Sequence, residues 1–389
     1  MLSLSHCFQK GLGTLVRGFA AANDVVFKRS FVAFLLLLEN MLNTVLEEEN
    51  WKYYVSLVSA TSESLLYGYL QTIKKDDQLL VISNGFDGDR IAKKAHSMGI
   101  YTLWMYHSML YPIDVDEAAQ DILYHHEATH ALFVHTESFT GSITPLRQIM
   151  KKVRKVRSDI SVCVDNRNGF LLHPMPTTDD IIDYSIHDTH ILGVQPSFSF
   201  MIAHKPAIMA EADVNPSGFL SSIYNSHMNL ETMTKVQGKY NEAMKDGSWR
   251  NIVYQYEETK ARIVNKVKLL LPPIPQGMDQ SCVSASFLVP QEAARLRELL
   301  ESLEEYGIPV EHKFITSGLP AISFNTEAII DYVEKGGDIL DIYKGIERVL
   351  LRHTPGFFQD GNLLKEEEKY RRKYVYGENI EIASNKTIT

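Results

Sequence analysis

Cysteine is scarce in this chain of 389 residues: there are three, Cys7, Cys163 and Cys282, which are far apart and odd in number. A disulfide framework requires pairs of cysteines, and a zinc knuckle requires closely spaced ones. The pattern favours reduced thiols, and therefore a cytosolic protein, over either kind of covalent or metal stabilisation.

The sequence also lacks a basic excess, a long apolar run and any internal repeat. Its 48 acidic and 39 basic residues give a net charge of −9, so we expect no nucleic-acid partner. The most apolar stretch, "FVAFLLLLENML", is far too short to span a membrane, and we expect no membrane partner. Repeat architectures and low-complexity segments are absent.

What the chain does have is apolar strands that alternate with amphipathic helices. The stretch "DQLLVISNGFDGDRIAKKAHSMGIYTLWMYHS" has the pattern of strand, turn, helix and strand. Similar strands are expected in "YYVSLV", "HALFV", "ISVCVD", "DYSIHD" and "SFSFMIAHK". Near-continuous apolar strands separated by helices are typical of a mostly parallel sheet covered on both faces. The predicted fold class is therefore α/β.

A proline-rich break, "LLLPPIPQGMDQS", marks the expected domain boundary. We predict an N-terminal arm over 1–30, a large domain over 31–270 and a small α+β domain over 271–389. The small domain is expected from "SCVSASFLVP", "AARLRELLESLEEYG", "IPVEHKFI", "PAISFN" and the helix "GDILDIYKGIERVLLRH".

Three predicted strands end in polar residues, and ligands of parallel sheets collect at such ends. Ser59, Ala60 and Thr61 precede a helix, where small hydroxyl residues suit a phosphate but also serve as ordinary helix caps. The segment "HTESFTG" is either a ligand loop or a polar turn. Asp165 ends a third strand, where its carboxylate suits a protonated ring nitrogen or simply caps a turn.

The order of these segments resembles the class V aminotransferases of pyridoxal phosphate fold type I, in particular the alanine–glyoxylate and 2-aminoethylphosphonate–pyruvate transaminases. The resemblance covers roughly residues 10–350. "VSATSESLLYGYL" stands at the family's phosphate turn, and "ISNGFDGDRIAKKAHSMGI" matches its Asn-Gly-aromatic-Gly-x-Arg segment. "VHTESFTGSITPL", "VCVDNRNGF" and "THILGVQPSFSFMIA" match three further segments of the family.

The resemblance implies a pyridoxal 5'-phosphate or pyridoxamine 5'-phosphate site at a homodimer interface. Asp165 would contact the ring nitrogen and Ser138 the pyridine hydroxyl. Ser226 would reach the phosphate from the partner subunit. The phosphate turn itself would be formed by Ser59, Ala60 and Thr61.

Four departures from the family pattern bear on chemistry. The lysine that forms the internal imine falls on His190, and the aromatic residue that stacks on the ring falls on Asp87, with Phe86 beside it. The family's N-terminal Gly-Pro segment is absent. The arginine that clamps a substrate carboxylate should lie in "ITSGLPAISFN", which contains none.

His190 cannot form a stable imine, so we expect any cofactor to be bound non-covalently. An imidazole can still move protons near neutral pH, and a fold-type I dehydratase family has histidine at this point. One hypothesis is an aminotransferase-like enzyme for a small amine or keto substrate, with His190 and Asp165 in catalytic roles. The alternative is a catalytically silent homologue that serves as a binding or partner subunit. His187 and His190 flank Asp188, but no third ligand is suitably spaced, so no metal site is expected.

Overall fold

The computed structural model describes residues 53–58, 61–173, 182–192, 199–204, 207, 238, 242, 248–275, 280–289, 293–314 and 320–350. The chain divides into two compact units. The first contains residues 1–107, 113–137 and 143–254, and the second contains 108–112, 138–142 and 255–389. The predicted arm over 1–30 lies outside the described residues, and the boundary expected at 270 stays a prediction.

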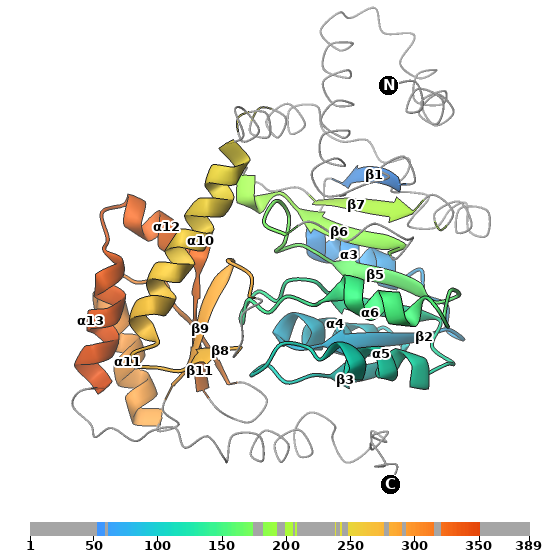
Figure 1. Ribbon diagram of the computed structural model, residues 1–389, viewed down its shortest axis with the longest axis horizontal. Helices are drawn as coiled ribbons and strands as arrows, with labels where there is room; N and C mark the ends of the chain where they lie inside the picture. The colour runs from blue at the N-terminus through green and yellow to red at the C-terminus, as the bar shows by residue number, and fades with distance from the viewer. Residues whose placement is uncertain are drawn as a thin grey trace, which may run out of the picture. The chain divides into compact units, whose positions relative to one another are not determined.

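The first unit is built on a seven-stranded sheet (Figure 1). Its central strands β3, β2, β4, β5 and β6 are all parallel, whereas β7 runs antiparallel to both of its neighbours, β6 and β1. The mostly parallel sheet expected from the sequence is therefore confirmed. In spatial order the strands are β1 (Tyr53–Val58), β7 (Ser199–His204), β6 (Tyr184–Asp188), β5 (Ser161–Asp165), β4 (His130–Val134), β2 (Gln78–Ser83) and β3 (Tyr101–Tyr106).

Helices cover both faces of this sheet. Figure 1 shows α5 (Val115–Tyr124) and α6 (Leu146–Val153) in front of the strands, and α3 (Ser62–Leu70) and α4 (Phe86–Ser97) behind them. Helix α5 was not anticipated, although Asp114 caps it by accepting hydrogen bonds from the N–H groups of Asp116 and Glu117. Because helices cover both faces of the sheet, side chains on both sides of its strands are buried, and the strand sequences are therefore almost continuously apolar.

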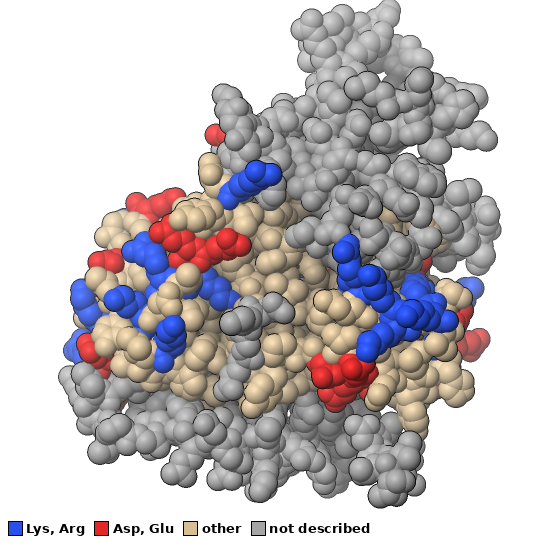
Figure 2. Space-filling model, in the orientation of Figure 1, with Lys and Arg blue, Asp and Glu red and all other residues tan. Residues whose placement is uncertain are grey.

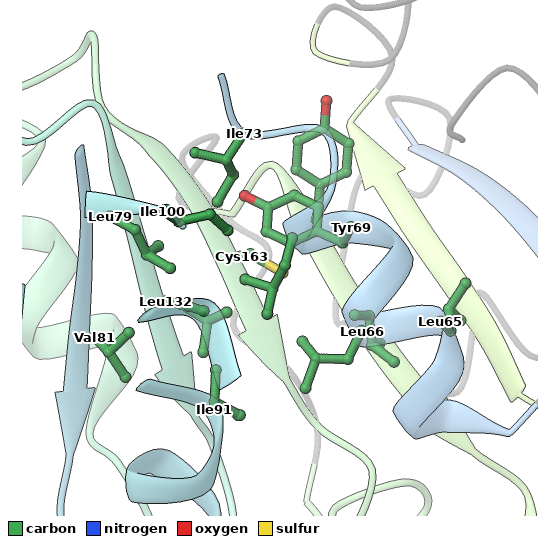
Figure 3. Close-up of a cluster of buried hydrophobic side chains, with 14 of the residues drawn as sticks. Leu65, Leu66, Tyr69, Ile73, Leu79, Val81, Ile91, Ile100, Leu132 and Cys163 are labelled. Atoms are coloured by element: carbon green, nitrogen blue, oxygen red, sulfur yellow. The ribbon is translucent and has the colours of Figure 1, made fainter. Parts of the chain in front are cut away.

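The core of the first unit lies between the sheet and helices α3 and α4 (Figure 3). Alternate residues of each strand point into it, such as Leu79 and Val81 of β2, because successive side chains of a strand face opposite ways. Cys163 of β5 is buried among these side chains as a free thiol. This packing fixes the strands, and hence the residues that follow them.

The second unit contains a four-stranded antiparallel sheet in the order β10-β11-β9-β8 and its own apolar core. The predicted strand and helix segments of the small α+β domain are present there. Helix α10 (Ser248–Val267) begins in the first unit and continues into the second from residue 255. The remaining elements of the second unit are β8 (Pro273–Ile274), β9 (Ser284–Leu288), α11 (Ala293–Glu305), β10 (Glu311–Phe314), β11 (Pro320–Asn325), α12 (Thr326–Glu334) and α13 (Ile339–Leu350).

Acidic and basic side chains are interspersed on the face of the molecule drawn in Figure 2. Lys152 of α6, for example, forms an ion pair with Asp116 of α5. Within the described part of the chain, none of the helices combines the length and the apolar character needed to cross a membrane.

Candidate functional site

The candidate site lies at the edge of the first unit's sheet where the parallel strands end. β4, β5 and β6 are parallel, so their carboxyl ends share this edge. β1 also ends there, because it is antiparallel to β7, which is antiparallel to β6. Thr61, Asp165 and His190 follow or end these strands. The fold thus brings three parts of the predicted site to the edge where ligands of such sheets collect.

Asp165, the last residue of β5, is buried and paired with Arg167. The Arg167 Nε donates to Oδ1 at 2.7 Å and its Nη2 donates to Oδ2 at 2.5 Å. The backbone N–H of Arg167 also donates to Oδ1, at 3.2 Å. The side chain of Asp165 is 2% exposed and that of Arg167 is 10% exposed. Both carboxylate oxygens therefore face a planar, permanently charged guanidinium in its preferred forked geometry.

Arg167 extends a chain of alternating charges toward helices α4 and α3. Its Nη2 lies 4.0 Å from Oδ1 of Asp87, and the same Asp87 oxygen accepts a hydrogen bond from Nη2 of Arg90 at 3.3 Å. Nη1 of Arg90 donates to Glu63 Oε1 at 2.5 Å. Asp87, at the position where the family has an aromatic residue, is thus a member of a charge network, while Phe86 beside it is half-buried at the start of α4.

The turn between β2 and α4 depends on Gly85. A Cβ atom at this position would lie 2.2 Å from Cγ of Glu137, so only glycine lets the Glu137 side chain approach. Glu137 is fully buried, and its Oε1 accepts a hydrogen bond from the backbone N–H of Asp87 at 3.3 Å. The glycine of the family-like Asn-Gly pair is thus explained by local packing against Glu137.

Thr61 caps helix α3, because its Oγ1 accepts a hydrogen bond from the N–H of Ser64 at 3.2 Å. This is the ordinary capping role, and it leaves the first turn of the helix oriented toward the strand ends. Ser62, the first residue of α3, lies close enough to Asp188 at the end of β6 for its hydroxyl group to lower the pKa of that carboxyl. The helix start therefore lies beside the end of β6.

Asp188 also holds His190, which begins a short 3-10 turn (His190–Leu192). Oδ1 of Asp188 accepts from the backbone N–H of His190 at 2.9 Å and lies 3.4 Å from its Nδ1. Burial acts to raise the pKa of Asp188, but His190 and the nearby Ser62 hydroxyl group outweigh it and leave the pKa below its ordinary value. The ionised carboxylate therefore orients an imidazole that is still 35% exposed.

A second histidine system, which the sequence did not reveal as such, links the ends of β4, β5 and β6. His135 donates from Nδ1 to Oδ1 of Asn166 at 2.8 Å, and Nδ2 of Asn166 donates to Nδ1 of His187 at 3.2 Å. Nε2 of His187 then donates to Oγ of Ser185 at 2.9 Å. Burial lowers the pKa of His187 to about 3, assisted by His135, so this imidazole is neutral. The chain of hydrogen bonds therefore links the ends of three strands through neutral side chains.

Ser138 begins the segment 138–142, which belongs to the second unit. The next residue, Phe139, accepts hydrogen bonds through its carbonyl oxygen from the hydroxyl groups of Ser284, Ser286 and Ser323. Ser138 therefore stands next to a tightly held carbonyl, and its predicted contact with a pyridine hydroxyl stays a prediction. Ser59, Ala60 and Ser226 lie outside the described residues.

The side chains of the described residues permit a test of the predicted cofactor contacts. The start of α3 has the backbone polarity that suits a phosphate, although Glu63 places a carboxylate in its first turn. Asp165 does not fit a protonated ring nitrogen as it stands, because both its oxygens are held by Arg167. The described residues contain no group of three or more His, Cys, Asp or Glu suited to a metal ion.

Comparison with known proteins identifies aminotransferases as relatives, although no protein-family model matches the chain. It is 24% identical to the 2-aminoethylphosphonate–pyruvate transaminase of Bacillus mycoides over 293 residues, which cover 70% of this chain and 78% of that protein.

Solved structures with the same fold include two aminotransferases. One is the ureidoglycine–glyoxylate aminotransferase of Bacillus subtilis, with a TM-score of 0.65 and 17% identity; the match covers 90% of this chain and 91% of that one. The other is the pyridoxamine–pyruvate aminotransferase of Mesorhizobium loti, with a TM-score of 0.64 and 14% identity; the match covers 87% of this chain and 93% of that one. The fold is therefore that of the fold type I pyridoxal phosphate-dependent transferases, as the sequence predicted.

Proposed function

We propose that the protein is an aminotransferase-like protein that binds pyridoxal or pyridoxamine phosphate without a covalent link and acts on a small amine or keto substrate. The cofactor class is supported by the similarity to 2-aminoethylphosphonate–pyruvate transaminases over 70% of the chain and by the shared fold. Such a cofactor, when bound, supplies an electron sink for chemistry at an amine-bearing carbon.

The observation that carries the proposal is the Ser62–Asp188–His190 cluster at the end of β6, beside the start of α3. The family resemblance implies that His190 takes the position of the imine-forming lysine, and an imidazole forms no stable imine. It can still exchange a proton with the α-carbon of an amine substrate. Because Asp188 faces Nδ1, the exchanged proton would be carried by Nε2.

Several finer features belong to the same proposal. A homodimer, in which Ser226 of one subunit reaches the site of the other, follows the family pattern. A cytosolic location agrees with the two buried free thiols, Cys163 and Cys282. Residues 315–325 contain no arginine to clamp a substrate carboxylate, so the substrate's acidic group, if it has one, is held elsewhere.

The second candidate is a catalytically silent homologue that serves as a binding or partner subunit. The observation that favours it is the ion pair between Asp165 and Arg167, which neutralises the carboxylate from within the chain. On this account the histidine at 190 only packs, and the protein contributes a surface instead of a reaction.

Absorbance titration with pyridoxamine phosphate separates the two candidates. We expect saturable binding to the wild-type protein and, within about threefold, to His190→Ala, since one partly exposed imidazole contributes little binding energy. We also expect the protein loaded with pyridoxal phosphate to exchange the protons on the amine-bearing carbon of 2-aminoethylphosphonate in deuterated water, and His190→Ala to lose this exchange.

His126→Ala is the matched control, because this exposed histidine lies in the turn before β4, away from the strand ends of the site. It should bind and exchange like the wild type. An absence of binding to any form would favour the silent homologue, and exchange that persists in His190→Ala would remove His190 from the chemistry.

A further inference from the structure

Arg167 has an unusual position for a residue in a turn. It stands two residues after Asp165, yet its side chain folds back into the sheet edge and is only 10% exposed. A cation this deeply buried needs partners that offset its lost hydration. The described residues supply two, Asp165 through paired hydrogen bonds and Asp87 at 4.0 Å.

The pairing uses the same carboxylate oxygens that a cofactor's ring nitrogen would need. Oδ1 of Asp165 already accepts from both the backbone N–H and Nε of Arg167, and Oδ2 accepts from Nη2. A protonated pyridine and a guanidinium are both planar cations that donate hydrogen bonds to a carboxylate. Arg167 already uses three of the about four acceptor positions of this carboxylate and offsets its charge, so the two cations compete for one buried acid.

The rest of the network keeps Arg167 in place. Asp87, which cannot stack on a ring, instead contacts the Arg167 guanidinium and accepts a hydrogen bond from Arg90. Nδ2 of Asn168 donates to the backbone carbonyl of Thr136 at 3.2 Å, which fixes the turn that carries Arg167. Asp87, one of the departures from the family pattern, is thus a partner of Arg167.

We propose that Arg167 is the internal counter-ion of Asp165 and competes with the ring nitrogen of pyridoxal or pyridoxamine phosphate for that carboxylate. Arg167 thereby limits affinity for the cofactor and leaves the ring nitrogen of any bound cofactor unprotonated. This inference rests on the proposed function, because it concerns the same cofactor at the same strand end.

The test replaces Arg167 by methionine, which keeps much of the side-chain volume but removes the charge. Titration with pyridoxamine phosphate should show Arg167→Met binding roughly tenfold to a hundredfold tighter than the wild type, the range expected for one regained charged hydrogen bond. The double variant Asp165→Asn/Arg167→Met should lose this gain, because no ionised carboxylate remains to pair with the ring.

A matched control is available at the opposite end of the same strands. Arg154 donates from Nη2 to Oδ2 of Asp183 at 2.9 Å, and these side chains are 15% and 18% exposed. Arg154→Met breaks a comparable buried pair away from the site. Its melting temperature should fall as that of Arg167→Met does, but only Arg167→Met should be restabilised by added pyridoxamine phosphate beyond the wild-type shift.

A second measurement needs no variant. The nitrogen-15 chemical shift of ring-labelled pyridoxamine phosphate bound to the wild-type protein should be that of a neutral pyridine. A shift typical of a protonated ring would overturn the inference even if Arg167→Met failed to fold.

The outcomes separate this inference from the proposed function. Wild-type binding that Arg167→Met leaves unchanged or weakens would overturn the role of Arg167 and leave the proposed function standing. Binding by Arg167→Met alone would support that role and favour the silent homologue. An absence of binding to both proteins would overturn both.

Discussion

The ends of strands β5 and β6 each carry a buried aspartate at the same edge of the sheet, yet the two carboxylates have different kinds of partner. Asp165 is bound on both oxygens by a guanidinium, which keeps its charge at every accessible pH. Asp188 lies beside a hydroxyl group and a partly exposed imidazole, which can gain and lose a proton.

The difference shows what each strand end can do. A fixed ion pair offsets the cost of burying charge and stabilises the turn, but it has no proton to give. The pairing at Asp188 orients an imidazole, a group that can act as a general acid or base. On the proposed function, the β5 end is the structural half of the site and the β6 end is the half that carries acid–base chemistry.

Breaking the fixed pair should have the largest effect on stability. Arg167→Met leaves the Asp165 carboxylate buried without its cation, and loss of one partner of a buried pair costs about 3–5 kcal/mol. Urea unfolding at pH 7 measures this free energy. The double variant Asp165→Asn/Arg167→Met should recover part of the lost free energy of unfolding. A loss of less than about 1 kcal/mol in Arg167→Met would contradict a buried ion pair.

The imidazole of His107, which follows β3, is buried, in contrast to the partly exposed imidazole of His190. Its Nε2 lies 3.2 Å from Oδ2 of Asp121 and its Nδ1 lies 3.6 Å from Glu117. Burial acts to lower the pKa of His107, but the nearby carboxylates of Asp121 and Glu117 raise it to about 9.

Because this pKa is raised on folding, the stabilisation is complete below the unfolded value of 6.5 and is lost as the pH rises through about 9. The loss should be about 3 kcal/mol, seen as a fall in the free energy of unfolding between pH 6 and pH 10. His107→Gln should lack that fall, and an equal fall in both proteins would assign it to other groups.

Asp188→Asn should have a smaller effect, because it weakens the interactions with His190 and Ser62 without stranding a charge. We expect a loss of about 1–2 kcal/mol at pH 7. The wild-type pKa is depressed, so this contribution is present above the unfolded value of 3.8 and disappears as the pH falls below it. A difference between the two proteins in free energy of unfolding that does not shrink as the pH falls from 5 to 3 would contradict the assignment.

His190→Ala should change stability least. The imidazole is 35% exposed and makes its described contacts with Asp188, so its removal should alter the free energy of unfolding by less than about 0.5–1 kcal/mol. A larger loss in the same urea measurement would identify His190 as a packing residue and favour the silent homologue.

Much of the fold was predictable because strand and helix periods are local properties of the sequence. The strands from β2 to β6 and helices α3 and α4 were anticipated. Helix α5 was missed, although Asp114 and the spacing of Ala118, Ala119 and Ile122 gave a usable signal. The antiparallel direction of β7 was not predictable, because strand direction depends on tertiary packing.

The site was predictable only in its outline. The positions of Asp165 and His190 at strand ends followed from the apolar runs that precede them. The return of Arg167 onto Asp165 was not anticipated, since an arginine two residues after an aspartate in a turn is usually solvated. The contact of Ser62 with Asp188 joins residues far apart in the chain, and no local pattern indicates it.

The most direct test of the account is borohydride reduction of the wild-type protein saturated with pyridoxal phosphate, followed by peptide mass spectrometry. With a histidine at 190, the account predicts that no lysine carries a phosphopyridoxyl group and that denaturation releases all of the bound cofactor. A phosphopyridoxyl group on any lysine, Lys205 included, would contradict it.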